Sequence, residues 1–210
     1  MTIDAYHHNL TEAGPDRPLL LLFHGTGGNE NQFMDVGAVL LPGATLVAPR
    51  GDVLERGAAR YFRRAAEGIY DMDDLARATA KMADFVAAHI EAANPSSVHG
   101  LGYSNGANIL ASVIFARPDL FDTAILMHPL IPFAPKIDSR LSTRILMTAG
   151  RADPICPPQL TTRLEAYLRD AGADLTTFWH EGGHDLRKGE FDAARQLLAD
   201  YAGNAAERTQ

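Results

Sequence analysis

Stretches of uninterrupted apolar residues alternate with amphipathic stretches along most of the chain. A short apolar run is typical of a strand covered on both faces, whereas apolar positions that recur every three or four residues indicate a helix with one buried face. These patterns predict strands at residues 19–23, 44–48, 98–102, 123–127, 144–149 and 174–179. They predict helices at residues 32–40, 73–93, 107–116, 160–170 and 190–201. The alternation predicts an α/β fold with a mostly parallel central sheet and helices on both faces.

The sequence shows no internal repeat, low-complexity segment or linker, so we expect a single domain spanning residues 1–210. The segment between the strands at 123–127 and 144–149 is short and contains Pro129, Pro132 and Pro135. It is too short and too rich in proline for a helical lid, and no lid domain is expected. Residues 202–210 are polar and are predicted to form a frayed end.

The motif Gly102-Tyr103-Ser104-Asn105-Gly106 lies between a predicted strand and a predicted helix. Strand, Gly-x-Ser-x-Gly and helix together form the nucleophile elbow of α/β-hydrolases. The sharp turn predicts a strained backbone at Ser104, and the two glycines remove side chains that would collide across it. Ser104 is therefore the candidate nucleophile, exposed at a helix N-terminus that favours negative charge.

A serine hydroxyl needs a base that takes its proton, and in this fold the acid and the base follow the serine in that order. Asp153 and His184 fit this order, and each follows a predicted strand. Both are predicted to lie at the carboxyl edge of the sheet, where such sheets bind ligands. The neighbouring Asp185 is interpreted as a helix-capping residue. His128 ends a strand and could line the pocket, but it precedes Asp153 in the chain and is set aside as the base.

The remaining histidines have a simpler interpretation. His7, His8, His89 and His180 are expected at the surface, and His99, within a strand, is expected to be either packed or exposed at a sheet edge.

The oxyanion formed during acyl transfer needs two preorganised N–H donors. One donor is expected from Asn105, the residue after the nucleophile. The second is expected from the backbone of Thr26, in the loop His24-Gly25-Thr26-Gly27-Gly28 that follows the first central strand. His24 is predicted to tie this loop down by hydrogen bonds. A phosphate-binding loop is the alternative, but neither Gly-Lys-Ser/Thr nor G-x-G-x-x-G is present.

Four segments carry a resemblance to a known family: FHGTGGNE at 23–30, GYSNGAN at 102–108, GRADPI at 150–155 and GHDL at 183–186. They resemble the phospholipase/carboxylesterase family of small α/β-hydrolases, which includes bacterial carboxylesterases and acyl-protein thioesterases. The resemblance implies that Ser104, Asp153 and His184 are catalytic and that Thr26 and Asn105 form the oxyanion hole. Many members have Leu at the position of Thr26, and the thioesterases have Gln at the position of Asn105, which argues against thioesterase specificity.

Phe62, Arg63, Leu130 and Phe133 are candidate substrate-binding residues, with Tyr61 and Tyr70 as further pocket candidates. Arg63 and Arg64 could hold a substrate carboxylate or could form structural ion pairs. Cys156 is interpreted as a small buried hydrophobe. No group of residues has the sequence spacing of metal ligands, so neither a metal nor a cofactor is expected.

The net charge of −7 and the lack of a basic run argue against binding to nucleic acid or stable association with a membrane. The chain has 1 cysteine and no recognisable signal peptide, which favours a cytoplasmic location. The expected partner is a small-molecule ester, and a homodimer is as compatible with the sequence as a monomer.

The predicted function is that of a serine carboxylesterase that hydrolyses small or short-chain esters through an acyl-enzyme. Acyl-thioesterase or lysophospholipase activity on the same residues is an alternative. A slow hydrolase-fold binding or receptor protein is another.

Overall fold

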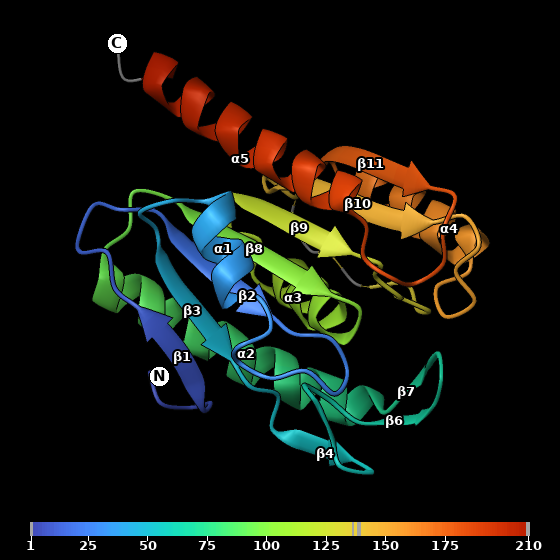
Figure 1. Cartoon of the computed structure of the whole chain (residues 1–210). Helices are drawn as coiled ribbons and strands as arrows, with labels where there is room; N and C mark the ends of the chain where they lie inside the picture. The colour runs from blue at the N-terminus through green and yellow to red at the C-terminus, as the bar shows by residue number, and fades with distance from the viewer. Residues whose placement is uncertain (1, 136, 138–139, 209–210) are drawn as a thin grey trace.

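The central sheet of the computed structural model, which describes residues 2–135, 137 and 140–208, has seven strands in the order β1-β3-β2-β8-β9-β10-β11 (Figure 1). The strands are β1 (His8–Thr11), β2 (Leu19–Phe23), β3 (Thr45–Pro49), β8 (Val98–Tyr103), β9 (Thr123–Met127), β10 (Arg144–Gly150) and β11 (Asp174–His180). All neighbouring pairs are parallel except β1 and β3. The predicted fold class is confirmed.

Helices cover both faces of this sheet: α1 (Met34–Leu40), α2 (Met72–Ala93), α3 (Asn105–Ala116), α4 (Pro158–Asp170) and α5 (Lys188–Arg208). Side chains of β2 alternate between two cores. Leu19, Leu21 and Phe23 pack with the buried residues of α2, α3 and α4, whereas Leu20 and Leu22 pack with those of α1 and α5. This two-sided burial is the reason that the sequence of β2 is apolar without interruption.

The chain reverses its direction across the sheet after β3. From β2 it first moves to β3 on one side and then returns to β8 on the other side of β2. The loops that follow β2 and β8 therefore diverge and leave a crevice at the carboxyl edge of the sheet, which is the usual ligand site in open α/β sheets. These are the loops that contain Thr26 and Ser104.

Two hairpins between β3 and α2 were not predicted. The first pairs β4 (Val53–Glu55) with β5 (Ala58–Arg60), and the second pairs β6 (Arg64–Ala66) with β7 (Ile69–Tyr70). Arg56 and Gly57, the two residues between β4 and β5, have φ angles of 51° and 85°. A tight hairpin turn requires such positive angles, and strands of two or three residues are too short to show an alternating pattern.

Two further predictions concern the last residues of the chain and the segment between β9 and β10. A frayed end was predicted for residues 202–210. Helix α5 continues to Arg208, so this prediction is wrong for residues 202–208, a stretch without proline in which alanine favours helix; residues 209–210 lie outside the described residues. Between β9 and β10 the described residues form neither helix nor strand, consistent with the expected lack of a lid domain. Within the described ranges, no helix is both long and apolar enough to cross a bilayer.

Candidate active site

Ser104 lies at the turn between β8 and α3 with φ 53° and ψ −115°. This left-handed backbone conformation is unfavourable for a residue with a side chain and is found at functional sites. A Cβ atom on Gly102 would lie 2.5 Å from the Gly106 carbonyl oxygen, and a Cβ atom on Gly106 would clash with the Phe23 carbonyl oxygen. The glycines thus allow the close approach that the sharp turn requires, as predicted.

The structure brings the three predicted residues into one hydrogen-bonded chain. The Ser104 hydroxyl donates to His184 Nε2 at 2.9 Å, and His184 Nδ1 donates to Asp153 Oδ2 at 2.8 Å. The other carboxylate oxygen of Asp153 accepts from the backbone amides of Ile155 and Cys156 at 2.8 and 2.9 Å. The arrangement provides a base next to the hydroxyl and an acceptor that fixes the tautomer of this base.

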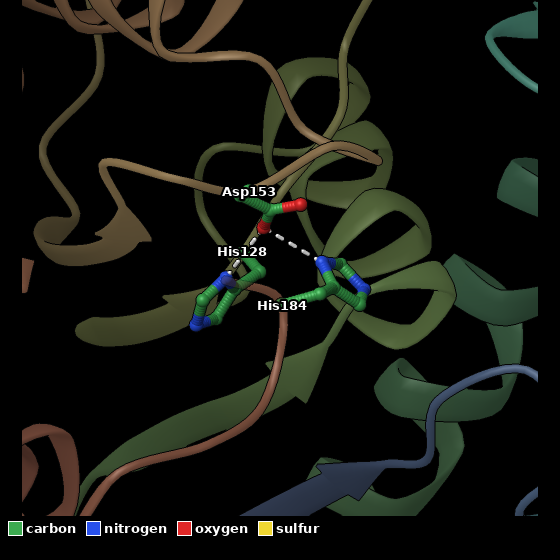
Figure 2. A group of neighbouring side chains, drawn as sticks. All are labelled: His128, Asp153 and His184. Atoms are coloured by element: carbon green, nitrogen blue, oxygen red, sulfur yellow. Dashed lines mark hydrogen bonds and ion pairs between the residues drawn. The ribbon is translucent and has the colours of Figure 1, made fainter. Parts of the chain in front are cut away.

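A second histidine also contacts Asp153, and the sequence analysis set it aside. His128 Nδ1 donates to Asp153 Oδ2 at 2.8 Å, so this single oxygen lies between two imidazole rings (Figure 2). Burial alone would raise the pKa of Asp153, but hydrogen bonds from the Cys156 amide, His128 and His184 outweigh it and hold the pKa below its usual range. Asp153 is therefore a stable carboxylate. The position of His128 at the end of a strand neighbouring β10 was the available sequence signal.

Thr26 and Asn105, whose backbone amides are the predicted oxyanion donors, line the same cavity as Ser104. Among the described residues, neither amide has a hydrogen-bond acceptor. The side chains fix the two residues in place: Thr26 Oγ1 accepts from Arg60 Nη1 at 2.6 Å, and Asn105 Oδ1 accepts from the Tyr61 amide at 2.8 Å. Two rigidly held, available N–H groups beside a serine can stabilise an oxyanion.

The loop that contains Thr26 is held by a buried histidine. His24 Nε2 accepts from the Gly51 amide at 2.9 Å, so its proton is on Nδ1, which donates to the Gly25 carbonyl at 2.7 Å. Gly27 has φ 79° and donates its amide to the Ala59 carbonyl of β5 at 2.9 Å. The predicted structural role of His24 agrees with these contacts, and the first unpredicted hairpin supports the loop.

A cavity of about 270 Å³ opens above Ser104 and His184. Its lining combines the two donor residues with side chains from the hairpins and from the loops after β9 and β10: Thr26, Arg60, Arg64, Glu67, Tyr70, Tyr103, Asn105, Asn108, Leu130, Ile155 and Cys156. The cavity has the position expected for a ligand site at the crevice between β2 and β8.

Of the four predicted substrate-binding residues, Leu130 lines this cavity and the other three do not. Phe62 is fully buried and packs against the Tyr70 ring, with ring centres 4.9 Å apart. Arg63 points outward to Asp71 and Asp74, both at 3.3 Å. The sequence could not predict these directions, because the irregular hairpins decide which side chains face the cavity.

Phe133 borders a separate apolar groove between α2 and α3 rather than the cavity above Ser104. In the place of Phe62 and Arg63, the hairpins present Arg60 and Arg64 to the cavity. Arg64 pairs with Glu55 and Glu67, and Arg60 also lies 3.3 Å from a Glu55 oxygen. Both arginines therefore form ion pairs with carboxylates of the hairpins.

Cys156 is buried as predicted, and its thiol donates to the His128 carbonyl at 3.2 Å. Burial raises the pKa of this thiol far above its ordinary value, so it stays protonated and is a poor nucleophile.

Two groups of side chains bring metal-ligating atoms within 4.8 Å of one another, although their sequence spacing predicted none: His128, Asp153 and His184, and His128, His180 and Glu190. Hydrogen bonds already account for the first group. In the second, His180 Nδ1 accepts from the Gly182 amide at 3.0 Å, which places the ring proton on Nε2 and leaves that atom no lone pair for an ion. In both groups the potential metal-ligating atoms are engaged in hydrogen bonds or carry a proton, so the residues present do not favour a metal ion.

Comparison with known proteins agrees with this geometry. A family model described as the dienelactone hydrolase family matches residues 3–209. The putative hydrolase MhqD of Bacillus subtilis is 39% identical over 191 residues, which cover 90% of this chain and 96% of that protein.

Two crystal structures extend the comparison. A protein of unknown function from Agrobacterium tumefaciens has a TM-score of 0.91 and 57% identity, covering 96% of this chain and 99% of that one. The carboxylesterase of Bacillus cereus has a TM-score of 0.87 and 34% identity, and the match covers 93% of this chain and 94% of that one. The predicted resemblance to small bacterial carboxylesterases is confirmed. The chain is therefore a hydrolase with the α/β-hydrolase fold and belongs to the dienelactone hydrolase family.

Proposed function

We propose that this chain is a serine carboxylesterase in which Ser104 is the nucleophile, His184 the general base and acid, and Asp153 the residue that orients His184. The main support is the continuous set of contacts from Ser104 Oγ to His184 Nε2 at 2.9 Å and from His184 Nδ1 to Asp153 at 2.8 Å, at the floor of an open cavity. The names of two similar proteins support esterase activity: the carboxylesterase of Bacillus cereus, and an esterase of Escherichia coli that is 28% identical over 181 residues.

The reaction follows from these contacts. His184 Nε2 takes the proton of Ser104 as Oγ forms a bond to the ester carbonyl carbon, and the amides of Thr26 and Asn105 bind the resulting oxyanion. The tetrahedral intermediate collapses, the carbon–oxygen bond to the alcohol breaks, and His184 returns the proton to the leaving alcohol. Water then attacks the acyl-enzyme by the same route and releases the acid and free Ser104.

The size of the cavity favours small acyl groups. The volume of about 270 Å³ lies just below the range of roughly 300–1,000 Å³ that is typical of small-molecule sites, and charged residues of the hairpins form part of the cavity wall. We propose short-chain esters as substrates, and thioesters or lysophospholipids as less well-fitting alternatives. A binding protein with a slow hydrolase site is the alternative outside the enzyme class.

The experiment is labelling with a fluorophosphonate probe together with hydrolysis of p-nitrophenyl esters from acetate to decanoate. Wild type is expected to react with the probe and to hydrolyse the short esters fastest. Ser104→Ala is expected to lose labelling and at least about a thousandfold in kcat. Ser112→Ala is the matched control, because Ser112 lies in α3 and its hydroxyl donates to the Asn108 carbonyl. Persistent labelling of folded Ser104→Ala would refute the proposal.

A further inference from the structure

His128 is held in an unusual way directly behind Asp153. Its φ angle is 51°, so, like Ser104, it has a left-handed backbone, and its side chain is fully buried. Its amide donates to the Thr148 carbonyl at 3.0 Å, and its own carbonyl accepts from Cys156. A buried residue kept in a sparsely populated conformation beside an active site suggests a functional constraint.

The two ring nitrogens of His128 each face a carboxylate. Nδ1 lies 2.8 Å from Asp153 Oδ2, and Nε2 lies 3.0 Å from Glu190 Oε2. An ionised carboxylate only accepts hydrogen bonds, so both nitrogens must carry a proton for both contacts to be favourable. The geometry therefore describes an imidazolium between two anions.

Glu190, the second anion, is fully buried and fully used as an acceptor. Its oxygens accept from the Thr148 hydroxyl and from the Arg187 amide, the latter at 2.6 Å, and His180 Nε2 lies 3.5 Å away. The bond to Arg187 caps the start of α5, a role that any glutamate could fill at the surface. Capping alone does not explain why this carboxylate is buried against two histidines.

Three further rings face His128. His180 Nε2 lies 3.4 Å from His128 Nε2, and both of these nitrogens face the Glu190 carboxylate. The rings of Tyr103, His180 and His184 lie 6.1, 5.3 and 5.1 Å from its ring, and Cys156 lies beside its backbone. Burial opposes the charged form of His128, but the hydrogen bonds and charges of Glu190 and Asp153 outweigh it and raise the pKa of His128. The same contacts, against the effect of burial, hold the pKa of Glu190 below its ordinary value.

We infer that His128 is a positioning residue: a permanent imidazolium, held by Glu190, that fixes the orientation of Asp153 and offsets part of its negative charge. The inference rests on the proposed role of Asp153 and His184. Because Asp153 Oδ2 accepts from both rings, its charge is divided between them. The positive charge of His128 thereby opposes the attraction of Asp153 for a positive charge on His184.

Glu190→Gln tests the inference because it keeps the shape of the side chain and removes its charge. The glutamine amide can then donate to His128 Nε2, so His128 becomes neutral while Nδ1 still donates to Asp153. Since the positive end of the His128–Glu190 pair faces His184, we expect the acid limb of the kcat/KM profile to move by about 1 pH unit to higher pH. Glu91→Gln, on the exposed end of α2, is the control for the loss of one charge and is expected to leave the profile unchanged.

A second readout does not depend on activity. In wild-type protein with ¹⁵N-labelled histidine, both ring nitrogens of His128 are expected to be protonated at pH 7, whereas Glu190→Gln is expected to have an unprotonated Nε2. One unprotonated nitrogen in the wild type would overturn the inference, as would an unmoved acid limb in folded Glu190→Gln. Failure of the proposed function would be seen instead as activity that persists in Ser104→Ala, which leaves the ring-nitrogen signals unaffected.

Discussion

Asp153 contacts two histidines that differ in their surroundings. His184 is partly open to the cavity and has one carboxylate and one hydroxyl as partners, whereas His128 is sealed from solvent and has two carboxylates. The open ring lines the cavity beside Ser104 and can exchange a proton with this residue and a substrate, whereas the sealed ring does not line the cavity. On the two proposals above, the same kind of side chain serves as a proton carrier on one side of Asp153 and as a fixed charge on the other.

The largest contrast is expected between His184→Ala and His128→Ala. The first removes the proposed base and is expected to reduce kcat by at least about a thousandfold with little loss of stability. The second leaves Glu190 buried without its charged partner and is expected to destabilise the protein by about 3–5 kcal/mol. Urea unfolding and ester hydrolysis on the same samples measure both effects. Equal stability of the two variants would remove the distinction between the rings.

Two substitutions of Thr26, in the loop that follows β2, separate the role of its side chain from the role of its backbone amide. Thr26→Leu keeps the backbone amide and is expected to retain most of kcat, although it loses the hydrogen bond from Arg60. Thr26→Pro removes the amide hydrogen and is expected to reduce kcat by about 10²–10³-fold. Circular dichroism and thermal unfolding control for loop damage. Full activity in a folded Thr26→Pro variant would place the second donor elsewhere.

The smallest effect concerns stability against pH. The raised pKa of His128 contributes stability that is complete below its unfolded value near pH 6.5 and is lost as the pH rises through the folded value. The lowered pKa values of Asp153 and Glu190 contribute stability above about pH 4 that is lost as the pH falls.

The melting temperature of the wild type is therefore expected to fall by about 3 °C as the pH rises through the folded pKa of His128. Glu190→Gln is expected to lack this decline, because its His128 is neutral throughout that range. Scanning calorimetry between pH 5 and 9 measures the two slopes. A flat wild-type curve would argue against a charged His128.

The extent to which the sequence predicted the molecule also differs between regions. The strands of the core were predicted because residues such as Leu20 and Leu21 face different helices and both must be apolar. Ser104, Asp153 and His184 were found because each follows a strand in a fixed chain order. In these cases the sequence pattern of a segment directly reflects its place in the fold.

The parts that were missed depend on contacts between distant segments. The hairpins between β3 and α2 have strands too short for a periodic pattern, so Phe62 could not be assigned to the core or Arg60 to the cavity. His128 and Glu190 are far apart in the chain and meet only because β9 and β10 end, and α5 begins, at the same edge of the sheet. Chain order predicted His184, which the structure places beside Ser104 and Asp153, and for the same reason set aside His128, which lies on the other side of Asp153.

The most direct test of the central claim is to trap the covalent intermediate. Wild-type protein is mixed with p-nitrophenyl butyrate, quenched with acid within one turnover, digested, and analysed by peptide mass spectrometry. The account predicts a butyryl group on Ser104. In the Thr26→Leu control, the amount of acylated Ser104 is expected to rise only in proportion to any slowing of turnover. A butyryl group on Cys156 or another residue, or steady hydrolysis without any acylated peptide, would contradict it.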